Sequence, residues 1–567
     1  MFTNKLTNAI AAGLLVFVGI ITFFSMKGDS LTMDELAHLP AGYSYLTQKD
    51  MRLNPEHPPL IKDLAALPLL FIKNINFPAD IKSWQEDVNG QWDFGRELLF
   101  RSGNPTAKMI FWGRIPMILL LLLLGFYILK FTRHFFGNKA GLLALFLFSF
   151  SPTLLAHGRL VTTDVAAAFG AIFAIYYFLK ALAAPTKKNI IFTGLAIGVA
   201  ELLKFSLILL FPLFGFLALI WWLIKSGNLK QVLKITAFTF IISLVLIGVV
   251  YQYHIWNYPK ERQINDIQSA LGSHFSAKLL TPMAGNPILR PYSQYGLGLA
   301  MIMQRAVGGN TTYFLGEISR EGWKTYFPIV YLIKEPLAFH ILTLLALIFA
   351  VWQFKRFRLR QHFTIFAMLS FVALYWLTSL NSNLNIGVRH LLPVFPFTII
   401  LVSAATISWL KPPFLKTKYS LLGILIFWQI ISVISVYPSF LAYFNELAGG
   451  PKNGYKYVAD SNLDWGQDLK RLTQWVDKNK IDKIYVDYFG GADPGYYLKE
   501  KFAPWRGDRN SSELPPGSYL AISATFLQGG RGIPAPGFNQ STGSYLWLNE
   551  YQPITTIGQS IFVYYID

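Results

Sequence analysis

The sequence predicts a multi-pass α-helical membrane protein that carries a small α/β domain at its C-terminal end. Composition is the first reason: hydrophobic residues make up 53% of the 567 residues and charged residues only 14%, against about 25% charged residues in soluble proteins. The second reason is a series of apolar stretches close to the length of about 20 residues that spans a bilayer. The third is the tail 438–567, which lacks such stretches and balances 12 Lys and Arg against 13 Asp and Glu.

Eleven apolar stretches are candidates for membrane-spanning helices. No small-x-small cleavage site follows the first one, so we expect a retained anchor and not a signal peptide. The fifth and sixth meet at Lys204 and can also form one bent hairpin. The eleven stretches are 9–26, 109–129, 140–156, 164–184, 190–203, 207–224, 235–254, 326–351, 363–380, 391–410 and 420–437.

The basic residues predict the orientation of these spans. With the N-terminus in the cytoplasm, the cytoplasmic segments hold 16 Lys and Arg and no Asp or Glu. This bias follows the positive-inside rule and predicts a plasma (inner) membrane protein with a cytoplasmic N-terminus. Because much of the net charge of +19 is then a topology signal, we expect no nucleic-acid partner. The segments are 1–8, 130–139, 185–189, 225–234, 352–362 and 411–418.

Three long segments then lie on the extracytoplasmic side: a first loop 27–108, a second loop 255–325 and the tail 438–567. We expect a transmembrane domain over 1–437 and a separate extracytoplasmic C-terminal domain. In the first loop, the apolar stretch 64–72 is too short to span and predicts a helix that lies in the membrane interface. In the tail, the pattern predicts an amphipathic helix and three strands at 468–480, 483–488, 519–522 and 561–565.

The candidate catalytic groups on the extracytoplasmic side are carboxylates and imidazoles. The chain has no cysteine, which excludes disulfides and a Cys nucleophile, and it has no P-loop or dinucleotide fingerprint. Asp34 and Glu35 follow the first span directly. Asp164 stands at the outer start of the fourth span, where a carboxylate serves either as a helix N-cap or in chemistry. Further titratable groups of the first loop are His38, Glu56 and His57.

Basic residues also gather near the outer ends of the spans. Lone cations at helix ends often only snorkel to the interface. Several cations together on the extracytoplasmic side, where the acidic residues lie, indicate a site for a lipid phosphate. The point charge of Lys and the planar fork of Arg both bind phosphate. Glu201 lies three residues before Lys204, so a pair between these two is an alternative. The candidates are Arg159, Lys204, Lys334, Arg389 and His390.

These pieces, in this order, resemble the GT-C glycosyltransferases. The group that they are most similar to is glycosyltransferase family 39, with the protein O-mannosyltransferases and the lipid A aminoarabinose transferase. The tail segment Asp460–Asp468 also resembles one found in many bacterial members. The resemblance covers the eleven spans, the tail more loosely, and implies the GT-C fold. The matching pieces are Asp34-Glu35, Glu56-His57-Pro58-Pro59-Leu60, Thr163-Asp164, Lys204 and Arg389-His390.

The resemblance implies an enzyme that moves a sugar, such as the hexose mannose, from a polyprenyl phosphate to an acceptor hydroxyl with inversion. The predicted topology agrees, because nucleotide sugars stay in the cytoplasm and an outward-facing site needs a lipid-borne donor. By resemblance, Asp34 takes the proton of the acceptor hydroxyl, and Lys204 and Arg389 hold the leaving phosphate. Asp164 and Glu35 would orient the acceptor or the cations.

Several alternatives stay open at this point. Some relatives hold a divalent metal ion, for which Glu56 and His57 are tentative ligands, although His57 stands where some relatives have Lys. The acceptor is a protein Ser or Thr, a glycolipid or a cell-wall glycan, and the tail either binds it or supports a lid. A transporter or flippase of lipid-linked sugars, with ionisable groups near the membrane midplane, is the main alternative function. A scaffold whose tail binds a partner is another.

Overall fold

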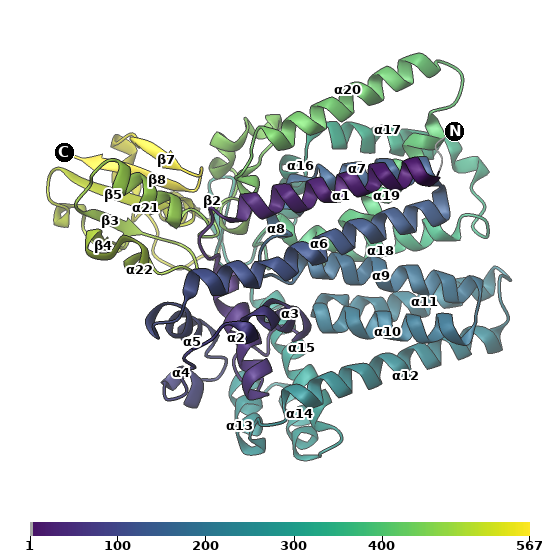
Figure 1. The fold of residues 1–567 in the computed structure, drawn as a ribbon, viewed down its shortest axis with the longest axis horizontal. Helices are drawn as coiled ribbons and strands as arrows, with labels where there is room; N and C mark the ends of the chain where they lie inside the picture. The colour runs from purple at the N-terminus through teal and green to yellow at the C-terminus, as the bar shows by residue number, and fades with distance from the viewer. Residues whose placement is uncertain (1–3) are drawn as a thin grey trace.

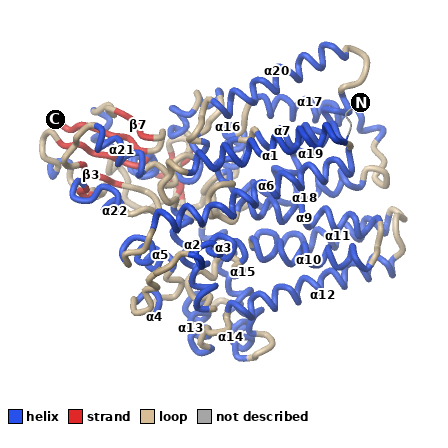
Figure 2. Tube along the Cα trace, in the orientation of Figure 1, coloured by secondary structure: helices blue, strands red, loops and turns tan. Residues whose placement is uncertain are grey.

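The computed structural model describes residues 4–567 and shows a bundle of long helices that run side by side, with a sheet at one end (Figure 1). Helix α1 (Asn4–Met26) starts at the end of the bundle opposite to the sheet. Figure 2 shows the strands gathered at the end that holds the C-terminus. The fold is therefore a helical membrane part with its extramembrane elements on one side.

Among the described residues, nine helices are long and apolar enough to cross a membrane. Two further stretches that the sequence predicts as spans form shorter helices, α7 (Asn138–Ser149) and α10 (Lys187–Leu203). The prediction of a multi-pass helical membrane protein is thereby confirmed, with nine candidate spans among the described residues. The nine are α1, α6 (Thr106–Phe136), α9 (Asp164–Ala183), η3 with α11 (Phe205–Leu223), α12 (Leu229–His254), α17 with η4 (Leu337–Arg356), α18 (Phe363–Leu380), η5 with α19 (Val388–Trp409) and α20 (Leu415–Ile434).

Two predicted spans are interrupted. The stretch 326–351 breaks at Glu335-Pro336 into α16 (Tyr326–Lys334) and α17 (Leu337–Gln353), because proline has no N–H to continue the helical ladder. The stretch 140–156 breaks after α7, and a short α8 (Pro152–His157) follows with Ser151 as its N-cap. The two breaks meet, because the Ser151 hydroxyl donates to the Glu335 carboxylate at 3.2 Å.

The first loop folds over the ends of the spans. Helix α2 (Met33–Gln48) packs against α3 (Leu60–Ala66), and α3 packs against α6. The 3₁₀ helix η1 (Leu67–Phe71) continues α3 and exposes Leu67, Leu70 and Phe71. This apolar face fits the predicted interfacial helix, whose place in a membrane stays a prediction. The smaller elements are α4 (Lys82–Gln85), α5 (Gln91–Arg96) and η2 (Glu97–Arg101).

The second loop forms three helices and a hairpin. Helix α15 packs against α12, α13 and α14, and its middle contacts the first loop, where Pro55 lies close to Gly298. The elements are α13 (Lys260–Leu271), α14 (Phe275–Gly285), α15 (Arg290–Gly308), β1 (Thr312–Phe314) and β2 (Glu317–Ser319).

The tail forms a five-stranded sheet in the order β4-β3-β5-β8-β7. Strands β4, β3 and β5 are parallel, and β8 and β7 are antiparallel to their neighbours. The predicted helix and the three predicted strands are present as α21, β3, β5 and β8. The elements are α21 (Leu469–Lys478), β3 (Ile484–Asp487), α22 (Pro494–Leu498), β4 (Phe502–Pro504), β5 (Ser518–Ser523), α23 (Ala524–Arg531), β7 (Thr555–Ile557) and β8 (Ile561–Ile566).

The tail is joined to the rest of the chain by more than its covalent link. Strand β6 (Ile533–Pro534) pairs in parallel with β2 of the second loop. The 3₁₀ turns η6 (Phe440–Ala442) and η9 (Asp460–Asn462) contact α8 and η5 of the membrane part. The boundary at residue 438 stays a prediction, but the two sides of it share a sheet and a core.

Candidate functional site

A cavity of about 330 Å³ lies where the first loop and α15 meet the ends of the spans on the side of the long loops. Its lining brings together eight of the eleven residues that the sequence predicts for the site. The other three, Glu35, Arg159 and Lys334, lie outside it. The eight are Asp34, His38, Glu56, His57, Asp164, Lys204, Arg389 and His390.

Helix α2 supplies the first carboxylate. The helix begins at Met33, so Asp34 stands in its first turn and His38 one turn further on the same face. Both side chains line the cavity, and the His38 Nδ1 atom lies 3.1 Å from the carbonyl of Val161. A carboxylate at the N-terminus of a helix is also favoured by the helix dipole.

Two aspartates and two cations form one connected cluster in the cavity. The Lys204 Nζ atom lies 2.5 Å from Asp164 Oδ1. The Arg389 Nη1 atom donates to Asp34 Oδ2 at 2.6 Å and lies 3.3 Å from Asp164 Oδ2. The side chain of Asp34 is 20% exposed, whereas that of Asp164 is 1% exposed. The buried Asp164 thus holds both cations, and Asp34 faces the open part of the cavity.

The chain positions Asp164 and Lys204 at the ends of neighbouring helices. Thr163 is the N-cap of α9, and Asp164 is the first helical residue. The alternative that Asp164 only caps the helix is therefore wrong. Lys204 ends α10 with extended backbone angles, φ −160° and ψ 132°, which turn it away from the helix face of Glu201. The predicted pair of Glu201 with Lys204 is wrong as well, because Glu201 accepts a hydrogen bond from the Tyr295 hydroxyl.

Glu35 does not line the cavity that Asp34 lines, since adjacent residues of a helix point about 100° apart around its axis. It is buried and accepts hydrogen bonds from Arg114 Nε at 2.8 Å and Nη2 at 2.6 Å. The backbone N–H groups of Thr32 and Val161 donate to the same carboxylate. Burial raises the pKa of Glu35, and Arg114 with these donors outweighs it, so the pKa lies below its ordinary value. Glu35 is an anchor between α2, α6 and the loop before α9.

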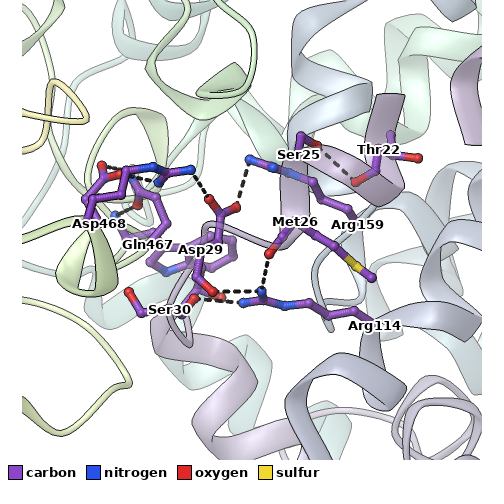
Figure 3. Close-up of polar contacts among 12 residues, drawn as sticks. Thr22, Ser25, Met26, Asp29, Ser30, Arg114, Arg159, Gln467 and Asp468 are labelled. Atoms are coloured by element: carbon purple, nitrogen blue, oxygen red, sulfur yellow. Dashed lines mark hydrogen bonds and ion pairs between the residues drawn. The ribbon is translucent and has the colours of Figure 1, made fainter. Parts of the chain in front are cut away.

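Arg159 and Lys334 are likewise held by the protein itself. Arg159 is buried, and its guanidinium lies 2.9 Å from the Asp29 carboxylate. Figure 3 marks this ion pair with a dashed line. The Lys334 ammonium donates to three carbonyls, of Leu441, Tyr443 and Asn462, at 2.8, 2.7 and 2.6 Å. An ammonium has three N–H groups, so Lys334 keeps none for a lipid phosphate. Neither residue belongs to the cavity.

Glu56 and His57 line the cavity from the first loop but do not fit a metal site. Glu56 accepts from Arg305 at 3.0 Å and from Asn89 at 2.6 Å. The ring of His57 packs edge-on against that of His38, and burial, with His38 and Lys62 nearby, lowers its pKa well below the ordinary value. No group of three His, Asp or Glu in residues 4–567 has the geometry to hold a metal ion.

The structure adds residues that the sequence analysis misses. Arg305 of α15 lines the cavity, Arg114 pairs with Glu35, and Ser461 and Trp465 contact Arg389. The sequence contains one pattern that indicates the structural role of Glu35. Thr-x-x-Glu at Thr32–Glu35 is the pattern of a capping box, in which the glutamate side chain binds the helix N-terminus. The contacts of Arg389 with the tail had no local signal, because their members lie more than 70 residues apart in the chain.

Structural comparisons give weak overall similarity. ArnT from Cupriavidus metallidurans bound to undecaprenyl phosphate is 12% identical, with 98% of this chain and 97% of that chain covered and a TM-score of 0.48. The oligosaccharyltransferase AglB from Archaeoglobus fulgidus is 12% identical over 90% of this chain and 69% of that chain, with a TM-score of 0.48. The Pmt1-Pmt2 protein O-mannosyltransferase complex of S. cerevisiae is 19% identical over 48% and 38%, with a TM-score of 0.35. No curated protein matches the chain.

A family match supplies the firmer finding. Residues 107–254 match the family described as dolichyl-phosphate-mannose-protein mannosyltransferase. These residues run from the start of α6 to the end of α12 and include both Asp164 and Lys204. The helices that supply the buried ion pair of the cavity therefore match a glycosyltransferase family. This match confirms the resemblance to glycosyltransferases noted in the sequence.

Proposed function

We propose that the protein is a membrane glycosyltransferase that moves a sugar from a polyprenyl phosphate to an acceptor hydroxyl on the extracytoplasmic side. The observation that carries this proposal is the cluster of Asp34, Asp164, Lys204 and Arg389 in one cavity. The family match supports it. The sugar is a hexose such as mannose, and the sequence-based orientation puts the cavity outside the plasma membrane, with the tail beside it.

The two cations suit the phosphate of the donor. Arg389 uses Nε and Nη1 for hydrogen bonds with Ser461 and the two aspartates, and within residues 4–567 its Nη2 makes no hydrogen bond or ion pair. The Nη2 edge of Arg389 is free to donate to a phosphate oxygen. The Lys204 ammonium is close by, because it pairs with the same Asp164 carboxylate as Arg389. When the sugar leaves, the phosphate gains negative charge. Fixed cations that meet this growing charge stabilise the transition state.

Asp34 is the base of the proposed reaction. The acceptor oxygen attacks the anomeric carbon from the side opposite to the phosphate, and the bond from that carbon to the phosphate oxygen breaks with its electron pair on the phosphate. The acceptor proton passes to the Asp34 carboxylate, which needs only hydrogen-bond reach of the hydroxyl. The products are an inverted glycoside and a polyprenyl phosphate. The exposure of Asp34 toward the cavity fits this role, and the pairing with Arg389 orients the carboxylate.

The rest of the lining suits a sugar on a lipid. His38, Glu56 and His57 add polar groups to the lining. Apolar side chains from η3 and from α15 also line the cavity, which suits a prenyl chain that reaches it from the membrane. The apolar residues are Phe205, Ile208, Leu209, Leu299, Ile302 and Met303.

The test uses the full chain in lipid nanodiscs with polyprenyl-phosphate mannose, radiolabelled in the sugar, and a membrane extract as the source of acceptors. We expect transfer by the parent, and a loss of roughly 100-fold or more in Asp34→Asn, the scale of a lost general base. Asp93→Asn is the matched control, since Asp93 is an exposed carboxylate of the same loop. Equal rates in Asp34→Asn and parent would show that the base is assigned wrongly.

A separate measurement addresses transport. Of the ionisable groups that a transporter would need inside the bundle, Glu201 is bound to Tyr295, and Glu335 lies beside Lys334 at the helix break. Movement of a fluorescent polyprenyl-phosphate sugar between leaflets, with no glycosidic bond broken, would favour the transporter and overturn the proposal. A glycan profile of a strain without the gene would identify the acceptor class.

A further inference from the structure

A short segment of the tail, Asp460–Trp465, contacts the side chain of Arg389. We propose that Ser461 and Trp465 are positioning residues that fix the Arg389 guanidinium, so that the tail completes the phosphate site and is not a separate acceptor-binding module. The inference rests on the proposed function, in which Arg389 holds the leaving phosphate. Both residues are buried, although they lie more than 70 positions from Arg389 in the chain.

The contacts act on two sides of the guanidinium. The Arg389 Nε–H donates to the Ser461 hydroxyl oxygen at 3.0 Å. The ring of Trp465 lies under the guanidinium, with 4.2 Å from its carbon to the ring centroid. Because the guanidinium is planar, a fixed Nε edge and a ring beneath it leave little freedom of rotation. The free Nη2 edge is thereby aimed in one direction.

The same segment also fixes the backbone next to Arg389. The Ser461 hydroxyl donates to the carbonyl of Ile386, and Asn462 Oδ1 accepts from the Val388 N–H at 2.9 Å. Gly387 lies between them with a φ of 144°, and a Cβ there would overlap the Ser461 hydroxyl. Only glycine combines this backbone angle with so close an approach. The loop that carries Arg389 is therefore shaped to receive the tail segment.

The segment reaches the base as well as the cation. The Trp465 carbonyl accepts from the N–H of Met33, the first residue of α2, at 3.0 Å. The next turn of the chain continues this contact: the Gln467 carbonyl accepts from Ser30 N–H at 2.9 Å. Figure 3 shows Gln467 and Asp468 of the tail beside Asp29 and Ser30 of the first loop. One segment of the tail thus contacts both Arg389 and the first residue of the helix that carries Asp34.

The test compares variants of the full chain in nanodiscs. We expect Ser461→Ala to lower kcat/KM for polyprenyl-phosphate mannose roughly tenfold, the scale of one hydrogen bond to a charged group, and to weaken inhibition by polyprenyl phosphate alone by a similar factor. Trp465→Leu should do the same, and Trp465→Phe should recover part of the loss, because it keeps an aromatic face. Melting curves correct each rate for the folded fraction.

Ser523→Ala is the matched control, because Ser523 is equally buried in the tail and its hydroxyl accepts one N–H, that of Phe489. If Ser461→Ala and Trp465→Leu keep parental kcat/KM and inhibition per folded molecule, or lose activity only as Ser523→Ala does, the inference is overturned. The variant Arg389→Gln distinguishes a failure of the proposed function from a failure of the inference about Ser461 and Trp465. Full activity in Arg389→Gln overturns the proposed function, whereas an inactive Arg389→Gln beside unaffected Ser461→Ala overturns only the inference.

Discussion

Replacing the two neighbouring carboxylates of α2 one at a time separates chemistry from stability. Glu35 and Arg114 have side chains that are 0% and 2% exposed, and they share two hydrogen bonds. Breaking a buried ion pair by removing one partner costs about 3–5 kcal/mol, because the other charge stays buried without compensation. Arg114 keeps three backbone carbonyls, of Met26, Asp29 and Ser30, so we expect Glu35→Gln to cost about 3 kcal/mol.

Asp34→Asn should behave in the opposite way. Its side chain faces the cavity, and Arg389 keeps Asp164 as a partner, so the free energy of unfolding should change by less than about 1 kcal/mol. Its transfer rate should fall roughly 100-fold or more, as the proposed base is gone. Glu35→Gln should keep a transfer rate within a few-fold of the parent per folded molecule.

The assay is thermal unfolding in detergent, followed by tryptophan fluorescence, together with the transfer rate per folded molecule. It is run near pH 7, because the pKa of Glu35 lies below its ordinary value of 4.5. For a carboxyl with a lowered pKa, the stability is present above the unfolded pKa and is lost as pH falls through the folded one. Equal melting temperatures for Glu35→Gln and parent would refute the argument from the buried pair. A folded but inactive Glu35→Gln would restore the catalytic role that the resemblance implies.

Three further predictions follow from the same contacts. Lys334→Gln should lower the melting temperature without changing KM for the lipid donor, since its ammonium binds only protein carbonyls; a changed KM would contradict this. Lys204→Gln should lower kcat and weaken inhibition by polyprenyl phosphate, and Lys204→Arg should recover part of both; no change in either would count against a phosphate role. Burial raises the pKa of Asp464 from 3.8 to about 8. A carboxyl with a raised pKa loses stability as pH rises from its unfolded to its folded pKa. The melting temperature of Asp464→Asn should therefore rise relative to that of the parent between pH 5 and 8. A constant difference between the two melting temperatures would refute this prediction.

Much of the fold was predictable because its signals are local. Spans are stretches of apolar residues, and all eleven predicted stretches form helices. The helix breaks were harder to predict from the sequence. Pro336 lies inside an otherwise apolar stretch, and the mean hydropathy of the stretch does not reveal a single proline. The helix and strands of the tail were predictable from periodicity, whereas the pairing of β6 with β2 across the predicted domain boundary was not.

The sequence by itself determined that this chain spans a membrane many times and carries carboxylates and cations near one end of its spans. It determined neither which charges pair nor which face the cavity. Lys204 pairs with Asp164, 40 residues away, and not with Glu201, three residues away, because the helix ends at Lys204 and its backbone turns. Charges removed from water must find partners wherever the folded chain supplies them. Only the tertiary structure decides those partners, and so it alone separates Asp34 from Glu35 and joins the tail to Arg389.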